Sequence, residues 1–331
     1  MGFTPAQIKG KIKSVAQKNH ADARTLMRIY MMERFLERIA SSQYRDKFII
    51  KGGMLVTAMV GVALRSTMDI DASIRNQNLS ADDALRIVDE IKSINLGDGV
   101  SFDIKEVSNI MDEMEYPGIR ITMNAIMKKL VTPIKIDIST GDVITPRAIE
   151  YPYKLLLDSR SINLWSYNLE TILAEKLQAV LTRGLFNTRM RDFYDIRTLL
   201  SIYEKDIDTD ILKKAFEATC QKRGTVNLKD RAPSIITTIS ADKKLNTLWQ
   251  GYQKKYPFAS DICYEDIIRS IKLLLRKCSL IDELNDAHLL AVASERMSHF
   301  DPASLISENE MNRRLGISQT DLSGFEEVDI E

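Results

Sequence analysis

Two aspartates separated by a single residue are the first feature of this sequence that could do chemistry. Asp69 and Asp71 alternate with apolar residues at positions 70, 72 and 74, which is the period of a strand with one buried face. Residues two apart on a strand point to the same side, so both carboxylates share one face. Such a pair is stabilised by a cation, and Mg²⁺ binds through one or two carboxylates together with substrate phosphates. Surface strands also carry acid pairs without function, so other residues have to support the interpretation.

A second stretch repeats the alternation. In residues 134–139 isoleucines occupy one face, and Lys135, Asp137 and Ser139 occupy the other. Three carboxylates can hold two metal ions about 3.5–4 Å apart, which clamp an in-line displacement at phosphorus. We therefore predict that Asp69, Asp71 and Asp137 bind Mg²⁺ or Mn²⁺ with a nucleoside triphosphate as substrate. The alternative is that Asp137 is merely solvated.

Glycines and cations flank the acidic pair. Gly52 and Gly53 lie between a short apolar run and a helical pattern, where glycine lets backbone amides approach a phosphate at a helix N-terminus. A tight turn that needs glycine dihedral angles is the alternative. Lys51 adds positive charge, and Arg65 and Thr67 stand just before Asp69. The predicted nucleotide-binding residues are Lys51, Gly52, Gly53, Arg65 and Thr67.

Two charged residues occupy unusual positions on later helical patterns. Lys176 lies inside the apolar stripe of residues 169–182, whereas Glu175 points away from it. A lysine on a buried face extends to solvent or meets a carboxylate or phosphate. Asp192 lies on the edge of the next apolar stripe, and Asp195 lies further round, where an ion pair with Arg191 is expected. The pattern leaves open whether Asp192 or Asp195 is the functional acid.

The elements that must position these residues change along the chain. Strands and helices are interleaved in the first half, which indicates an α/β or α+β fold. The second half is mostly helical. Expected helices cover 4–18, 22–41, about 53–62, 80–94, 168–183, 189–204, 208–222, 264–278 and 281–296, and expected strands cover 48–50, 69–75, 100–107, 119–127, 133–139, 151–157 and 161–165. We expect a catalytic domain over 1–160, a helical domain over 161–318 that contributes Lys176 and Asp192 to the cleft, and a flexible acidic tail over 319–331.

Composition excludes several classes of protein. Lys plus Arg and Asp plus Glu are both 46, so a uniformly basic nucleic-acid coat is excluded, although a local patch is not. Three separated cysteines without a Cys-x-x-Cys pattern argue against a disulfide framework or a structural zinc site. The polar start of the sequence and the lack of a long apolar run predict neither a signal peptide nor a membrane span. A cytoplasmic setting is expected.

Four stretches together resemble one family. They are KGGMLVTAMVGVALRSTMDID (51–71), VTPIKIDIS (131–139), LETILAEKLQAVLTR (169–183) and RMRDFYDIRTLL (189–200). In this order they resemble the AbiEii toxins, the nucleotidyltransferase component of type IV toxin–antitoxin and abortive-infection systems. The resemblance implies a DNA-polymerase-β-like nucleotidyltransferase core with N-terminal helices and a helical C-terminal domain.

The same resemblance implies roles for particular residues. Asp69 and Asp71 would be the metal-binding acids, and Lys176 and Asp192 the later lysine and aspartate needed for activity. The family's glycine motif often reads Gly-Ser, whereas this chain has Gly52–Gly53 and lacks that hydroxyl. Some relatives add nucleotides to the 3′ end of transfer RNA and block translation.

The leading hypothesis is therefore transfer of a nucleotide from an NTP to RNA, with a tRNA 3′ end as the favoured acceptor. With this activity we expect a cognate antitoxin as a partner and a role in phage defence. Transfer to a small molecule such as an aminoglycoside, or to a protein side chain, is the second hypothesis. A catalytically dead nucleotide-binding module is the third. Cations expected to bind the acceptor are Lys128, Lys129, Arg183, Arg189, Lys213, Lys214, Lys222 and Arg223.

Overall fold

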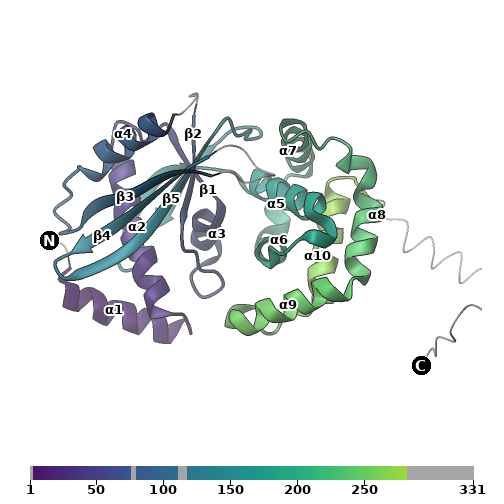
Figure 1. Ribbon diagram of the computed structural model, residues 1–331. Helices are drawn as coiled ribbons and strands as arrows, with labels where there is room; N and C mark the ends of the chain where they lie inside the picture. Colours follow the sequence, from purple (N-terminus) through teal and green to yellow (C-terminus); the bar gives the residue numbers. More distant parts are fainter. Residues whose placement is uncertain (1–2, 76–79, 111–117, 282–331) are drawn as a thin grey trace, which may run out of the picture. The chain divides into compact units, whose positions relative to one another are not determined.

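A mixed β-sheet organises the first part of the chain. The computed structural model describes residues 3–75, 80–110 and 118–281. In these residues seven strands form one sheet in the order β3-β4-β5-β2-β1-β7-β6 (Figure 1). The strands are β1 (Phe48–Lys51), β2 (Ile70–Ile74), β3 (Ser101–Ile110), β4 (Gly118–Met127), β5 (Leu130–Thr140), β6 (Ile149–Lys154) and β7 (Ser161–Ser166).

The strand directions bring distant segments together at the centre of the sheet. Strand β1 is antiparallel to β2 and parallel to β7, and β2 is parallel to β5. The remaining neighbours are antiparallel. Because β5 returns beside β2 after the β3–β4 hairpin, residues about 65 positions apart along the chain become direct neighbours.

One face of the sheet is covered by helices α2 (Ala23–Ser41) and α4 (Ala81–Lys92), and α1 (Pro5–Lys18) packs against α2. Helix α2 packs against β5, β7 and α4, and α4 also packs against β3 and β4. Ile70, Ala72 and Ile74 of β2 are buried on this side. The opposite face therefore carries the polar residues that alternate with them.

A group of helices follows the sheet. Its members are α5 (Leu169–Arg183), α6 (Met190–Tyr203), α7 (Thr209–Lys222), α8 (Leu228–Ala241), α9 (Lys243–Lys255) and α10 (Tyr264–Lys277). Helix α5 packs against α6, α7 and α8, and α10 packs against α6, α7 and α8. Helix α3 (Gly52–Val60) contacts α6 as well as β1 and β2, so it links the sheet to these helices. The Tyr203 hydroxyl strengthens this link by donating a hydrogen bond to the Met59 carbonyl at 2.7 Å.

The α/β (α+β) fold predicted from the sequence, with N-terminal helices and a helical C-terminal part, is confirmed. The expected boundary at 160/161 falls between the paired strands β6 and β7. Residues Met1–Ile281 gather into one compact unit. The proposed tail 319–331 and nearly all of the helix expected at 281–296 lie outside the described residues.

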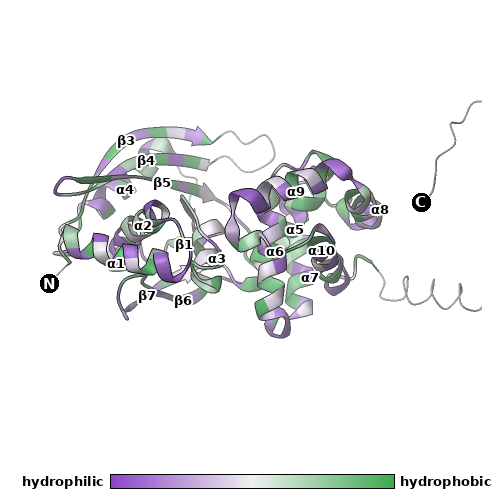
Figure 2. Ribbon diagram, turned by 90° about the horizontal axis from the view of Figure 1, so that it is seen from below, coloured by the Kyte–Doolittle hydropathy of each residue, from purple (hydrophilic) through white to green (hydrophobic). Residues whose placement is uncertain are grey.

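Helices α8 and α9 were missed by the sequence analysis. Helix α8 contains Pro233, which interrupts the helical signal although Leu228, Ala232, Ile236 and Ile239 keep a buried spacing of three and four. Hydrophilic residues occupy much of α8 and α9 (Figure 2). In α9 the buried residues are Leu245 and Trp249, too few for a clear periodic pattern. Among the described residues, none of the helices is both long enough and apolar enough to cross a bilayer.

Candidate active site

A row of charged residues crosses four neighbouring strands on the polar face of the sheet. Lys51 of β1 lies opposite Asp71 of β2, and Asp71 lies opposite Asp137 of β5. Arg120 of β4 ends the row beside Asp137. Neighbouring strands are about 4.8 Å apart, so two carboxylates stand side by side with a cation at each end. The structure thus brings together Asp71 and Asp137, which the strand alternation had placed on one face.

Burial and mutual repulsion make the carboxylates of this site unusual. Asp69 lies just before β2 and is half-buried. Burial raises the pKa of Asp69, and the Asp137 carboxylate raises it further. Burial also raises the pKa of Asp71, although a backbone hydrogen bond opposes this. Burial therefore disfavours the ionised form of both carboxyl groups, and a bound cation would offset that cost.

The hydrogen bond to Asp71 comes from the start of helix α3. The Gly53 backbone N–H donates to Asp71 Oδ2 at 2.9 Å. Gly52 has a φ of +58°, and a Cβ at this residue would lie 2.2 Å from Asp71 Oδ2. Glycine is therefore required at position 52, both by the backbone angle and by the approach of the carboxylate.

Thr67 takes up the space beside Gly53. A Cβ at residue 53 would lie 2.6 Å from Thr67 Oγ1, and the Thr67 side chain is buried. Its hydroxyl donates to the Asp69 carbonyl at 3.2 Å. In the Gly-Ser form of the motif a side chain extends from the second residue, whereas here the Thr67 hydroxyl occupies that place. A side chain at position 53 would therefore collide with Thr67.

Arg120 holds Asp137 through two hydrogen bonds. Its Nε and Nη2 donate to the two carboxylate oxygens at 2.7 and 2.6 Å. Among the described residues, no three His, Cys, Asp or Glu side chains are arranged to bind a metal ion. Asp69 and Asp71 nevertheless fit a hard divalent cation, because both offer carboxylate oxygens whose ionised form is disfavoured by burial and would be stabilised by a bound cation. Asp137 would join them when Arg120 releases one of its oxygens.

Lys176 lies in a buried network of ions. Its ammonium donates to Asp192 Oδ1 at 3.2 Å and to Asp195 Oδ2 at 2.6 Å. Asp195 also accepts from Arg65 Nε at 2.7 Å and is fully buried. The Arg65 guanidinium and the Lys176 ammonium keep the pKa of Asp195 at about 2. The expected Arg191–Asp195 pair is therefore wrong, because Asp195 faces the segment before Asp69 and not the outside of its own helix.

This network also changes the interpretation of Arg65. Its side chain is 3% exposed and is committed to Asp195, so it joins the segment before β2 to helix α6. Its Nη2 still lies 3.6 Å from the position of a Cβ at Gly53. A direct contact between Arg65 and phosphate stays a prediction, and the ion pair is the contact that the structure provides.

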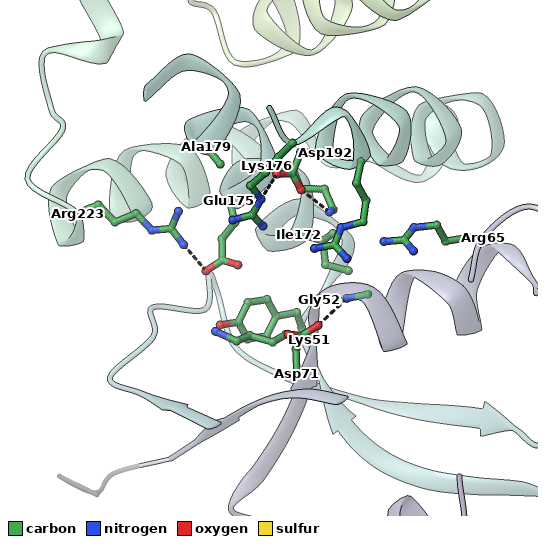
Figure 3. Close-up of a pocket in the computed structure, with 14 residues that line it drawn as sticks. Lys51, Gly52, Arg65, Asp71, Ile172, Glu175, Lys176, Ala179, Asp192 and Arg223 are labelled. Carbon is green, nitrogen blue, oxygen red and sulfur yellow. Dashed lines mark hydrogen bonds and ion pairs between the residues drawn. The ribbon is translucent and has the colours of Figure 1, made fainter. Parts of the chain in front are cut away.

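Residues from both parts of the chain line one continuous cleft. Two adjoining hollows share the lining residues Lys51, Asp71, Arg189, Arg191 and Arg223. Figure 3 shows Asp71 and Gly52 on one side of the cleft, with Lys176 and Asp192 on the other. The cleft thus combines acids from the sheet with cations from the helices.

Lys51 is fixed at the side of this cleft. Its ammonium donates to Asp142 Oδ2, which also accepts from the hydroxyls of Ser139 and Tyr167 at 2.7 Å each. Glu175 lines the cleft as well, although its position on the helical wheel predicted that it points away from the buried stripe. Its carboxylate lies 3.3 Å from Arg223 Nη2.

Two residues of the candidate site were missed. Arg120 had a signal, because it alternates with Ile119 and Ile121 and must share the face of Asp137. Asp142 follows the end of β5 in a loop, where no period indicates a direction.

Comparison with known proteins identifies the family. Residues 34–269 match the family model described as nucleotidyl transferase AbiEii toxin, type IV TA system. The chain belongs to this family. No curated protein sequence matches it.

Solved structures resemble this AbiEii-family chain only distantly. JHP933 from Helicobacter pylori is 16% identical with a TM-score of 0.43, over 82% of this chain and 99% of that one. A putative nucleotidyltransferase from the same organism has the same identity and score, over 79% and 99%. An antigenic nucleotidyltransferase-like protein from Paracoccidioides brasiliensis is 14% identical with a TM-score of 0.32, over 76% and 100%. The family match therefore carries the assignment.

Membership of the AbiEii family makes the chain a nucleotidyltransferase of the toxin–antitoxin type. It implies a nucleotide substrate and a cognate antitoxin, and the family in general uses an NTP with a divalent metal. The cleft between the sheet and helices α5 and α6 is where the observed residues fit such a substrate.

Proposed function

We propose that this chain transfers a nucleoside monophosphate from an NTP to an RNA acceptor, with a tRNA 3′ end as the favoured acceptor, and thereby blocks growth. The observation that carries the proposal is the single cleft lined by acids from β2 and β5 and by cations from α5 and α6. Acids beside a helix N-terminus suit a metal-bound triphosphate, and the cations opposite suit its phosphate charge.

In this proposal Asp69 and Asp71 would hold a divalent cation, with Asp137 as the third ligand. Bound there, the metal would neutralise phosphate charge and polarise the phosphorus–oxygen bonds. Lys176, Arg189 and Arg191 lie across the cleft and offset the negative charge that develops on the phosphates. Lys176 is well placed for this task because Asp192 and Asp195 fix its ammonium before the substrate arrives.

The transfer itself is an in-line displacement. An acceptor hydroxyl oxygen forms a bond to the α-phosphorus, the bond from that phosphorus to the bridging oxygen breaks, and pyrophosphate leaves. The hydroxyl proton passes to a carboxylate oxygen of Asp137. Each carboxylate oxygen has two lone pairs, so Asp137 can bind the cation through the oxygen that Arg120 releases and still have acceptor capacity for this proton.

The test is labelling of total RNA with each of the four α-³²P-labelled NTPs and Mg²⁺. We expect the wild type to label a tRNA-sized band, and Asp69→Ala and Lys176→Ala to lose activity by roughly 10²–10³-fold, as when one group that stabilises transition-state charge is removed. Growth arrest on expression should disappear in the same variants. Label found in protein or in a small molecule would show that the acceptor belongs to that class and not to RNA. Unchanged labelling and unchanged toxicity in both variants would refute the assigned site.

We further propose that a cognate antitoxin limits this activity and that the pair acts in phage defence, as family membership leads one to expect. Co-expression of a neighbouring gene that restores growth would support this role. Continued arrest with every neighbouring gene would contradict it.

A further inference from the structure

The N-terminal helices carry a local excess of positive charge, although the chain as a whole has no net charge. The first thirty residues contain six Lys or Arg residues and one acidic residue, Asp22, whereas the whole chain has 46 of each sign. The Asp22 carboxylate caps α2 by accepting from the Thr25 backbone N–H at 2.7 Å. The cations of α1 and α2 therefore form a local basic surface on a neutral protein.

Four of these cations border a groove. Lys9 and Lys13 of α1 and Arg24 and Arg28 of α2 line it, and none of the described residues that line it is acidic. The floor is apolar and consists of Ile12, Met27, Leu130, Val131 and Pro133. Val131 is 52% exposed, which is unusual for a valine within a strand.

The groove exists because the first residues of β5 extend beyond the part of the strand that pairs with β2. The pairing of β2 with β5 begins at Ile70 and Ile136. Residues Leu130 to Lys135 therefore have β4 on one side and, within the part of the chain that the structure describes, no strand on the other. Helices α1 and α2 lie beside this open edge and supply its cations.

The groove leads to the active site. Arg28 Nη1 lies 3.0 Å from Met68 Sδ, and Met68 directly precedes Asp69. From Val131 to Asp137 the same strand covers about 20 Å, at roughly 3.3 Å per residue. Lys128 and Lys129, in the turn before β5, continue the positive charge beyond the groove. A polyanion bound in the groove can thus extend along β5 to the catalytic acids.

We propose that this groove binds the phosphate backbone of the RNA acceptor, several nucleotides away from the reacting end. The inference rests on the proposed function, and it gives the acceptor a docking surface outside the nucleotide cleft. Charge selects a polyanion as the occupant, and the contact at Met68 favours the molecule that must also reach Asp69. The family match begins at residue 34, so all four cations lie outside it.

The groove offers no hydrogen-bonding code for base identity. Its floor is aliphatic apart from the buried Thr132, and the charged groups at its rim are cations that contact phosphates equally in any sequence. Binding at the groove should therefore be independent of RNA sequence and strongly dependent on salt. Choice of the end that is extended would remain with the catalytic cleft.

The test compares two double variants of α1 that remove the same charge. Lys9→Gln/Lys13→Gln removes two groove cations, whereas Lys11→Gln/Lys18→Gln removes two exposed cations of the same helix that do not line the groove. Binding of total tRNA is measured by filter retention across salt concentrations, together with the KM for tRNA and for the NTP. Thermal unfolding of both variants checks that they are folded.

The groove variant should bind tRNA about 15-fold more weakly at 0.15 M salt, because each lost phosphate contact costs about fourfold there. The slope of log Kd against log salt should decrease by about 1.4, because each of the two lost contacts contributes roughly 0.7 to it. The KM for tRNA should rise in parallel while the KM for the NTP stays the same, and the control variant should behave as wild type. Arg24→Gln/Lys13→Gln, with one change on each helix, should reproduce the groove effect.

Three results would overturn the proposal. Equal tRNA affinity in the groove and control variants would refute the groove as the RNA-binding site. If the wild type still labelled RNA in that case, the proposed function would stand. Wild-type protein that neither binds nor labels RNA would refute the groove and the acceptor class together. Loss of binding to a polyglutamate peptide, with tRNA binding unchanged, would make the groove a site for an acidic protein instead.

Discussion

The contact between Gly53 and Thr67 allows a sharp test of how the active site is built. A methyl group added at position 53 would place Cβ 2.6 Å from Thr67 Oγ1 and 3.3 Å from Thr67 Cβ. Both atoms belong to a short buried side chain, so neither can move away freely. Gly53→Ala should therefore be destabilising because of overpacking, even though the residue lies in a helix.

The expected magnitude follows from two opposing effects. Overpacking a buried position costs about 1–3 kcal/mol. Replacing glycine by alanine within a helix stabilises by about 1 kcal/mol. Gly53→Ala should thus lower the free energy of unfolding by as much as about 2 kcal/mol in the presence of Thr67. In the background of Thr67→Ala the 2.6 Å contact is removed and the contacts at 3.3 and 3.6 Å remain, so the same change should be neutral or stabilising.

Urea unfolding of the four proteins in this cycle gives the coupling energy. We expect about 1–3 kcal/mol between the two positions, within the range of residues in direct contact. Thr67→Val is the matched control, because its branched side chain keeps an atom near the Oγ1 position and should preserve the penalty of Gly53→Ala. A coupling below about 0.5 kcal/mol would show that Thr67 does not fill the place of a side chain at position 53.

Four further predictions concern the charged groups. Asp71→Asn should abolish nucleotide transfer yet unfold at a higher urea concentration than wild type, because it removes a carboxylate whose pKa is raised by burial; a less stable variant would contradict this. Asp195→Asn should cost roughly 3–5 kcal/mol in urea unfolding, since two buried cations lose their shared counter-ion, and a cost below about 1 kcal/mol would exclude that role. Arg120→Gln should lower the Mg²⁺ concentration that gives half-maximal labelling, because Asp137 is released from its guanidinium partner, whereas an unchanged or higher requirement would argue against competition. Burial raises the pKa of Glu33 from 4.5 to about 8, so the folded state keeps the proton of this carboxyl group where the unfolded state loses it. The free energy of unfolding should therefore fall as the pH rises between these two values, by up to about 1.4 kcal/mol per pH unit. Glu33→Gln should lack this fall when unfolding is measured against pH, and a fall that persists in the variant would assign it to another group.

The sequence predicted the catalytic strands well because they obey a simple period. Asp71 and Asp137 alternate with isoleucine or alanine, and the structure places both on the same face in direct register. The row that they form with Lys51 and Arg120 was not predicted, because strand order is set by pairing between distant segments and leaves no local signal.

The helical residues were predicted less completely for a different reason. The position of Lys176 inside an apolar stripe predicted that it extends to solvent or meets a carboxylate or phosphate, and in the structure its ammonium meets two carboxylates. The choice between Asp192 and Asp195 depended on what faces the helix from outside, and Arg65 lies 130 residues earlier in the chain than Asp195. Both acids contact Lys176, so the two alternatives left by the sequence are members of one network.

Helix α2 divides its tasks along its length. Arg24 and Arg28 are in its first half, at the groove. Its second half is anchored, since Arg38 donates to Asp98 at 2.8 and 2.9 Å and Glu33 accepts from a backbone N–H on the way to β7. The helix therefore connects two regions of the protein. Its second half is fixed beside the sheet, and its first half links the groove, through the contact of Arg28 with Met68, to the segment that carries Asp69.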